Sequence, residues 1–254
     1  MTINVRKPQR SCKYIRLFIL YYAHLALTLH FETKQNNKKI MQTAALFDLD
    51  GVIVDTEGQY TEFWKGIGNQ DFPNVPDFAF RIKGHTLTQI LNAHYPDNEA
   101  AQKRVVEELN VFEQNMKFPY IAGAVDFVKA LRQAGIPTAV VTSSNNAKMQ
   151  CLYRCHPELP TLFDRVFTAE NARRSKPAPD CYMDAAVALG CKPEACCVFE
   201  DSISGLQAGQ GSGAAVVGLT TGNSADTIAP LCNCVINDFT EFTVEQMLHL
   251  ISKK

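Results

Sequence analysis

The chain has 254 residues, a formal net charge of −1 at pH 7 and an apolar fraction of 46%. A near-neutral charge argues against the strong basic surface of a nucleic-acid or membrane-surface protein, so we expect neither partner. The length is sufficient for one large α/β core and a small accessory unit.

The nine cysteines are odd in number, and Cys181, Cys196 and Cys197 fall in segments that we expect to be buried. Buried free thiols fit a reducing compartment better than a disulfide framework, so we expect a cytoplasmic protein. The Cys232-Asn-Cys234 pair has no second cluster and is a weak metal candidate.

Residues 1–40 follow a different pattern from the rest of the chain. Several basic residues precede an apolar stretch at 17–31, as in a signal peptide or a short membrane anchor. That stretch contains His24 and His30 and is too short to span a bilayer comfortably. We therefore expect Met41 to be the biological start and residues 1–40 to be an extension outside the fold.

The stretch from Phe47 to Glu57 places Asp48 and Asp50 one residue apart after an apolar run, at a turn that contains glycine. Two carboxylates at a strand end repel each other unless a cation, a proton or N–H donors hold them. One carboxylate can attack an electrophile while the other moves protons. A bare Asp-x-Asp is usually just an acidic loop, but the whole stretch favours a functional site.

Three further segments carry a hydroxyl, an ammonium or carboxylates that could act together with Asp48 and Asp50. The run at 138–141 ends at the hydroxyl of Thr142, and Lys176 is followed by Pro-x-Pro, which fixes where the ammonium points. The run at 196–199 delivers Glu200 and Asp201. For Asp201, capping of the following helix is the alternative role.

Taken in order, these four motifs resemble those of the haloacid dehalogenase superfamily of aspartate-nucleophile phosphotransferases. The resemblance implies that Asp48 is the nucleophile, that Asp50 moves protons, and that Thr142 and Lys176 hold the phosphoryl group. It also implies Mg²⁺ bound by Asp48 and Asp201, by the carbonyl of Asp50, and with Glu200 as a ligand or an acceptor outside the metal shell.

Residues 57–119 show apolar positions at helical spacing, which the family would place in an inserted helical cap of the C1 type. Residues 41–56 and 120–254 alternate helix and strand, which indicates an α/β, Rossmann-like three-layer core with a parallel sheet and ligands at its carboxyl edge. The expected helices are 121–134, one from 146, 180–189 and 204–212, and the expected strands are 136–141, 165–168, 195–199 and 214–219.

Within the family, the chain most resembles β-phosphoglucomutase and its sister sugar-phosphate phosphatases. Two departures favour the phosphatase, because Tyr60 stands where the mutase has a histidine and Leu87 where it has a cap arginine. A mutase must grip the phosphate that does not react, which requires a cation, and His85 or Arg81 is the alternative source of one. Phosphoglucomutase is therefore the alternative function. Inorganic pyrophosphatase and a non-catalytic binding module are less favoured.

The expected substrate is a small phosphorylated metabolite of the sugar-phosphate type, and we expect a monomer because the cap must swing freely. Besides the four catalytic residues, the candidate phosphate and substrate contacts are the backbone at Leu49 and Ser143, together with Ser144, Asn146, Thr56, Tyr60, Gly84, His85, Thr86 and Ser202.

Overall fold

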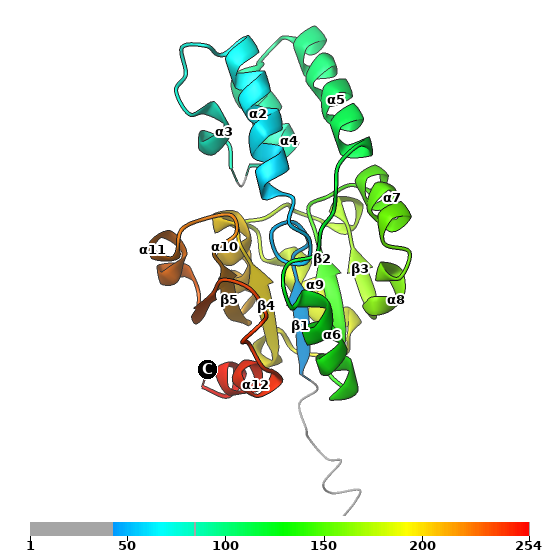
Figure 1. Cartoon of the computed structure of the whole chain (residues 1–254). Coiled ribbons are helices and arrows are strands. Elements are labelled where there is room, and N and C mark those ends of the chain that lie inside the picture. The colour runs from blue at the N-terminus through cyan, green and yellow to red at the C-terminus, as the bar shows by residue number, and fades with distance from the viewer. Residues whose placement is uncertain (1–42, 84, 254) are drawn as a thin grey trace, which may run out of the picture. The chain divides into compact units, whose positions relative to one another are not determined.

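A computed structural model describes residues 43–83 and 85–253 (Figure 1). The expectations for residues 1–40, for Met41 and for Gly84 lie outside the described residues.

The core is a parallel sheet with the strand order β3-β2-β1-β4-β5-β6. Every residue of β1, β2, β4 and β5 is buried, which explains why these strands are mostly apolar, with Thr138 and Glu200 as the polar residues at two strand ends. The α/β fold expected from the sequence is thus confirmed. The strands are β1 (Ala44–Phe47), β2 (Thr138–Val141), β3 (Arg165–Phe167), β4 (Cys196–Glu200), β5 (Ala215–Leu219) and β6 (Cys234–Ile236).

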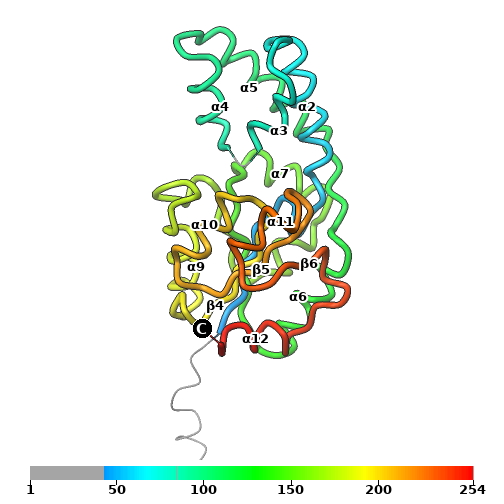
Figure 2. The backbone as a smooth tube through the Cα atoms, turned by 90° about the vertical axis from the view of Figure 1, so that its left-hand side faces the viewer, coloured from blue at the N-terminus to red at the C-terminus, as the bar shows by residue number. Residues whose placement is uncertain are grey.

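Helices cover both faces of the sheet and complete the three layers (Figure 2). One face packs against α6 (Ala124–Gln133), α7 (Asn146–Cys155), α8 (Leu159–Leu162) and α12 (Val244–Ser252). The other face packs against α9 (Asp180–Ala188), α10 (Ile203–Ser212) and α11 (Ala225–Ile228). Short 3₁₀ turns lie at Ala169–Asn171, Pro193–Ala195 and Ala229–Leu231.

The alternation of side chains along β1 divides its residues between two cores. Ala45 and Phe47 belong to the first core, and Ala44 and Leu46 to the second. The ring of Phe47 stacks on that of Phe199 in the neighbouring strand, with centroids 4.6 Å apart. This packing fixes the register of β1 beside β4, and with it the position of the residues that follow both strands.

Four helices between Glu57 and Gln114 lie beyond the carboxyl edge of the sheet (Figure 1). They are α2 (Glu57–Asp71), α3 (Phe78–Arg81), α4 (Leu87–His94) and α5 (Glu99–Gln114), and their buried residues form a third apolar cluster of their own. We propose that residues 57–119 are the cap expected from the sequence, and we use that name below.

Two connections join the cap to the core and run side by side. The Asp55 N–H donates to the Pro119 carbonyl at 2.8 Å, and the Ile121 N–H donates to the Ile53 carbonyl at 2.9 Å. These bonds place the entry and the exit of the cap together, directly above the motif that follows β1.

Most core elements lie close to their expected bounds, but several were not anticipated. The helix expected from residue 121 begins at Ala124, because Gly123 adopts φ +74° and a Cβ there would lie 2.7 Å from the Phe239 backbone. Four further elements carry no clear signal in the sequence: the edge strand β6, the short helices α8 and α11, and the C-terminal helix α12.

Candidate active site

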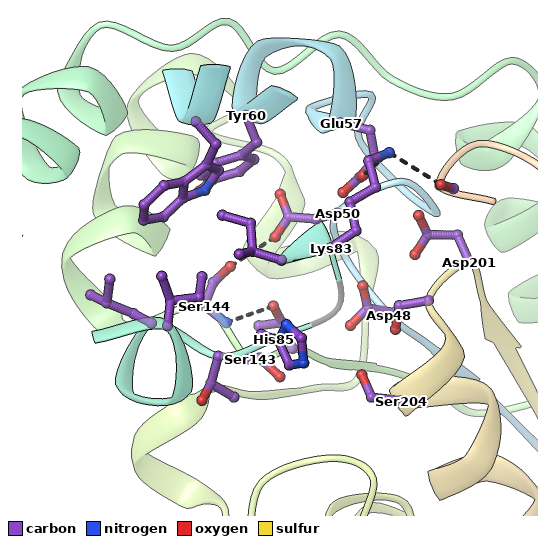
Figure 3. Close-up of a pocket in the computed structure, with 18 of the residues that line it drawn as sticks. Asp48, Asp50, Glu57, Tyr60, Lys83, His85, Ser143, Ser144, Asp201 and Ser204 are labelled. Atoms are coloured by element: carbon purple, nitrogen blue, oxygen red, sulfur yellow. Dashed lines mark hydrogen bonds and ion pairs between the residues drawn. The ribbon is translucent and has the colours of Figure 1, made fainter. Parts of the chain in front are cut away.

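The carboxyl ends of three adjacent strands bring the sequence motifs together. Asp48 and Asp50 follow β1, Thr142 follows β2, and Asp201 follows β4. Asp48, Asp50, Thr142, Lys176 and Asp201 all line one pocket of about 280 Å³, whose opposite wall is formed by cap residues. Figure 3 shows Asp48, Asp50 and Asp201 on the core side of this pocket, facing Tyr60, Glu57 and Lys83 of the cap.

Lys176 is a buried ammonium that lies between two carboxylates. Its Nζ is 2.6 Å from Asp48 Oδ1, 2.6 Å from Glu200 Oε1 and 3.1 Å from the Val141 carbonyl. Burial lowers the pKa of Lys176, but Asp48 and Glu200 outweigh it and hold that pKa well above its ordinary value. Lys176 is therefore a fixed positive charge beside the Asp48 carboxylate.

Asp48, Glu200 and Asp201 form a buried acidic cluster whose oxygen atoms lie within 4.8 Å of one another. Burial raises the pKa of Asp48 to about 7, even though Lys176 opposes the shift. The pKa of Asp201 is raised well above its ordinary value, first by burial and then by Glu57, Glu200 and Asp48. With one ammonium among three acids, ionisation of all three would leave an excess of negative charge that a further cation would relieve.

Two glycines make room for the Asp201 carboxylate. A Cβ on Gly51, which adopts φ +73°, or on Gly222 would lie 2.2 Å from Asp201 Oδ2. The backbone therefore holds this carboxylate close against the motif that follows β1. Carboxylate and carbonyl oxygens are the ligands of a hard divalent cation, so the donor set of Asp48, Asp201 and the Asp50 carbonyl fits Mg²⁺.

The contacts of Glu200 distinguish the two roles that the sequence left open for it. Oε1 accepts hydrogen bonds from Lys176 and Tyr182, and Oε2 accepts from the backbone N–H of Asp201 and from the N–H and hydroxyl of Ser202. Both oxygens are thus engaged by protein donors. This arrangement favours Glu200 as an acceptor that positions Lys176 over a role as a direct metal ligand.

Asp50 is held by four donor contacts from three side chains. Lys148 Nζ lies 2.6 Å from each carboxylate oxygen, Thr56 donates at 2.5 Å and Ser144 donates at 2.8 Å. Burial raises the pKa of Asp50, but the Lys148 ammonium and these hydrogen bonds outweigh it and leave that pKa below its ordinary value. Asp50 is therefore held as a carboxylate.

Lys148 was missed by the sequence analysis. It lies in the first turn of α7, where the helix dipole disfavours a cation, and its side chain is only 3% exposed. A lysine in the first turn of a helix that follows a motif strand was therefore the available signal. Glu113, also missed, accepts a hydrogen bond from the Tyr60 hydroxyl at 2.7 Å and lines the pocket.

Thr142 and Ser143 are placed to contact an anion in the pocket. The Thr142 hydroxyl oxygen accepts from the Ser144 N–H at 3.0 Å, which leaves the hydroxyl hydrogen available for donation. Ser143 is exposed and lines the pocket. The side chain of Leu49 is fully buried, so only its backbone can serve a ligand, as expected.

Three of the expected substrate contacts have side chains that are already engaged within the protein. Thr56 is fully buried and does not line the pocket, because its hydroxyl donates to Asp50 instead. The Asn146 side chain lies outside the pocket, where its Oδ1 accepts from Thr168. Ser144 lines the pocket, but its hydroxyl is engaged by Asp50.

The remaining expected contacts line the pocket with their polar atoms already partly used. The Thr86 side chain accepts from the Gln89 N–H in the capping box of α4, and Ser202 caps α10. Tyr60 and His85 also face the pocket (Figure 3).

The comparisons with known proteins agree with this geometry. The family model for haloacid dehalogenase-like hydrolases matches residues 42–213. The chain belongs to the haloacid dehalogenase-like hydrolases. It is therefore an enzyme, and its architecture is that of this family.

Three curated relatives illustrate the range of this hydrolase family. The chain is 31% identical over 207 residues to the probable pseudouridine-5′-phosphatase YKL033W-A of Saccharomyces cerevisiae, covering 68% of this chain and 80% of that protein. It is 28% identical to a β-phosphoglucomutase of Mycobacterium bovis, covering 78% and 90%. It is 25% identical to a bifunctional riboflavin kinase/FMN phosphatase of Arabidopsis thaliana, covering 83% of this chain but only 57% of that protein's length.

A solved structure with the same fold is the haloacid dehalogenase hydrolase, family IA, variant 3, from Entamoeba histolytica HM-1:IMSS. It has a TM-score of 0.74 and 27% sequence identity, and the match covers 83% of this hydrolase and 99% of that chain. Among the described residues of this hydrolase, no helix is both long and apolar enough to cross a bilayer.

Proposed function

We propose that this hydrolase is a Mg²⁺-dependent phosphatase that acts on a small phosphorylated metabolite through an aspartyl-phosphate on Asp48. The observation that carries this proposal is the Asp48 carboxylate, which lines the pocket 2.6 Å from the Lys176 ammonium and beside two further acids. The phosphatase names of two relatives point the same way. Sugar phosphates are the expected substrate class.

In the first half of the reaction, an Asp48 oxygen attacks phosphorus while Lys176 and the Thr142 hydroxyl hold the phosphoryl oxygens. The bond from phosphorus to the leaving oxygen breaks, and Asp50 relays to that oxygen the proton that the monoanionic phosphate ester brings into the pocket. Bound by Asp48, Asp201 and the Asp50 carbonyl, Mg²⁺ would supply positive charge that offsets the charge of the carboxylates and the phosphoryl group.

In the second half, the Asp50 carboxylate takes a proton from a water molecule as the water oxygen attacks phosphorus. The bond between phosphorus and the Asp48 oxygen breaks, inorganic phosphate forms, and Asp48 returns to a carboxylate. Cap residues over the pocket exclude bulk water from this step.

The charges in the pocket favour hydrolysis over phosphoryl transfer between sugar hydroxyls. Among the described residues that line the pocket, each lysine is paired with a carboxylate: Lys83 with Glu57, Lys148 with Asp50, and Lys176 with Asp48. No arginine is among these lining residues. A mutase must hold a bisphosphate, and a pyrophosphatase a second phosphoryl group, and either task requires a free cation.

The size and the wall of the pocket favour a small substrate. A volume of about 280 Å³ lies at the lower end of the range for small-molecule sites. Much of the cap wall is apolar, through Trp64, Ala79, Ile82, Leu87 and Ile90, so this wall is expected to make few polar contacts with the leaving group. We further propose a monomer, since the cap contains its own apolar core and needs no partner to fold.

The test is phosphate release in Mg²⁺ from a panel of sugar, polyol and nucleoside monophosphates and pyrophosphate, beside a coupled assay for conversion of glucose 1-phosphate to glucose 6-phosphate. Asp48→Asn should lower phosphate release about 10³-fold or more, because the covalent route is lost. Excess chelator should abolish turnover. Asp126→Asn, at an exposed site on α6, is the matched control and should change neither rate nor metal dependence.

Wild-type turnover by the Asp48→Asn enzyme would overturn the nucleophile assignment. Full activity in excess chelator would overturn the metal requirement. Isomerisation that outpaces phosphate release would show that the acceptor is a sugar hydroxyl rather than water.

A further inference from the structure

Lys148 reaches from the first turn of α7 to both oxygens of Asp50. The two contacts are 2.6 Å each, while Thr56 and Ser144 bind one oxygen each. The four contacts fix the plane of the Asp50 carboxylate. Of the three side chains, Lys148 alone carries a charge and reaches both oxygens.

The position of Lys148 is unfavourable unless Asp50 compensates for it. Its side chain is 3% exposed, so the ammonium has lost most of its hydration. The Asn145 side chain accepts from the Lys148 N–H as the N-cap of α7, which places the ammonium near the positive end of the helix dipole. A cation in this place implies a role beyond the stability of α7.

The cap covers the other side of this ammonium. Lys148 Nζ lies 4.6 Å from the centroid of the Tyr60 ring, within the range of a cation–π contact. The Tyr60 hydroxyl in turn donates to Glu113 at 2.7 Å, which fixes the ring between α2 and α5. Both Tyr60 and Glu113 belong to the cap, whereas Lys148 and Asp50 belong to the core.

We propose that Lys148 is a positioning residue that fixes the orientation of the Asp50 side chain for the attack of water on the phosphoenzyme, and that Tyr60 completes this arrangement from the cap. The inference rests on the proposed function, in which Asp50 accepts the proton of the attacking water. In this arrangement the role of Tyr60 is to contact Lys148 rather than to bind the substrate.

This role separates the two halves of the reaction. With p-nitrophenyl phosphate, the leaving group departs without a proton from Asp50, so formation of the phosphoenzyme does not depend on Lys148. Hydrolysis of the phosphoenzyme needs Asp50 as the general base, so that step depends on Lys148. Loss of Lys148 therefore lowers kcat while kcat/KM, which reports the first half, is maintained.

The experiment is steady-state and rapid-quench kinetics of Lys148→Met on p-nitrophenyl phosphate with Mg²⁺. We expect kcat to fall at least tenfold and kcat/KM to change less than threefold, as expected for impaired general base catalysis. A burst of nitrophenol approaching one equivalent per enzyme should appear, and the intact mass of acid-quenched protein should show the accumulated phosphoenzyme. Lys148→Arg, which keeps the charge, should recover part of kcat.

Two further comparisons isolate the contribution of the cap and the effect of removing a lysine. Tyr60→Leu removes the ring over Lys148 and should give a weaker form of the same pattern, whereas Tyr60→Phe keeps the ring and should remain closer to wild type. Lys83→Met removes another lysine of the pocket that does not contact Asp50, and it should raise KM rather than lower kcat.

Equal losses in kcat and kcat/KM without a burst, or a wild-type kcat, in Lys148→Met would overturn the inference. If Lys148→Met fails to fold, the burst in Tyr60→Leu and its absence in Tyr60→Phe decide the question. If wild-type enzyme forms no phosphoenzyme and Asp48→Asn retains turnover, the proposed function itself fails, which is a different result from each of these.

Discussion

At the scale of single residues, Glu200 occupies space that only glycine at position 205 leaves open. A Cβ on Gly205 would lie 1.7 Å from Glu200 Oε1, the oxygen that accepts from Lys176 and Tyr182. Glu200 cannot retreat without losing these bonds and those of its second oxygen. Glycine at position 205 is thus needed for Glu200 to hold Lys176 in place.

Gly205→Ala is predicted to displace Glu200, to lower activity at least tenfold and to cost about 2 kcal/mol of unfolding free energy, since a buried network is broken. Gly211→Ala is the control in the same helix, because its new Cβ would meet Pro179 only at 3.4 Å. The control should be neutral or gain about 0.5 kcal/mol. Urea unfolding and phosphate release measure both variants, and an equal response would contradict this account.

The raised pKa values of Asp48 and Asp201 make the stability of the metal-free protein depend on pH. The folded form binds a proton on Asp48 with a pKa of about 7, against an ordinary value of 3.8. Its contribution to stability is therefore complete below about pH 4 and is lost as the pH rises to about 7. Asp201 is shifted in the same direction. Asp50 has a lowered pKa, and its contribution is lost only as the pH falls through that low pKa.

The unfolding free energy in chelator is predicted to fall by about 2 kcal/mol between pH 5 and pH 7.5. Addition of Mg²⁺ should restore stability more at pH 7.5 than at pH 5, because the metal binds the carboxylate forms. Urea unfolding measures both effects. Asp48→Asn is the control, and its unfolding free energy should fall less over this pH range. An unchanged fall would show that Asp48 does not cause the pH dependence.

At the scale of elements, α12 lies far from the pocket but packs against the strands whose ends form the pocket. Met247 is fully buried in the same apolar cluster as Phe47 and Phe199. Leu248, the next residue, is 40% exposed. The helix thus covers one face of the sheet near β4, whose carboxyl end carries Glu200 and Asp201.

Met247→Ala is predicted to lower the unfolding free energy by about 3 kcal/mol, the usual loss for a fully buried methionine. Leu248→Ala in the same turn should cost less than about 0.5 kcal/mol. Denaturant titrations of the two variants provide the test, and similar losses for both would mean that α12 does not pack as described.

At the scale of the whole molecule, the proposed function predicts that contact between the cap and the core matters for turnover. Lys83 of the cap pairs with Glu57 at 3.0 Å and donates to the Gly222 carbonyl of the core at 3.1 Å. Gly222 also adjoins the Asp201 carboxylate. Lys83 therefore links the cap to the loop beside the proposed Mg²⁺ ligand Asp201.

Lys83→Met is predicted to raise KM about fivefold with little change in kcat, since a partly exposed ion pair is worth up to about 1 kcal/mol. Hydrogen exchange at residues 57–119 should increase at the same time. Lys65→Met, which removes the exposed pair with Glu62 on α2, is the control and should leave both constants unchanged. A fall in kcat with an unchanged KM would contradict a closing role.

The sequence by itself determined that several apolar strands are each followed by reactive side chains. Asp48, Asp50, Thr142 and Asp201 could be named because strand periodicity is local, and because parallel strands carry their following residues to one edge of the sheet. Lys176 was named from its Pro-x-Pro context, and the resemblance to the family motifs supplied the roles. That information is contained in short stretches of sequence, and the structure brings these residues into one pocket.

Only the tertiary structure decided which partners these residues have. Lys148 and Asp50 are 98 residues apart, and Tyr60 and Glu113 are 53 apart, and no local pattern links either pair. The direction of the Asn146 side chain likewise depends on Thr168 in another loop. Such contacts arise from how helices and strands pack in three dimensions, which hydrophobic periodicity does not specify.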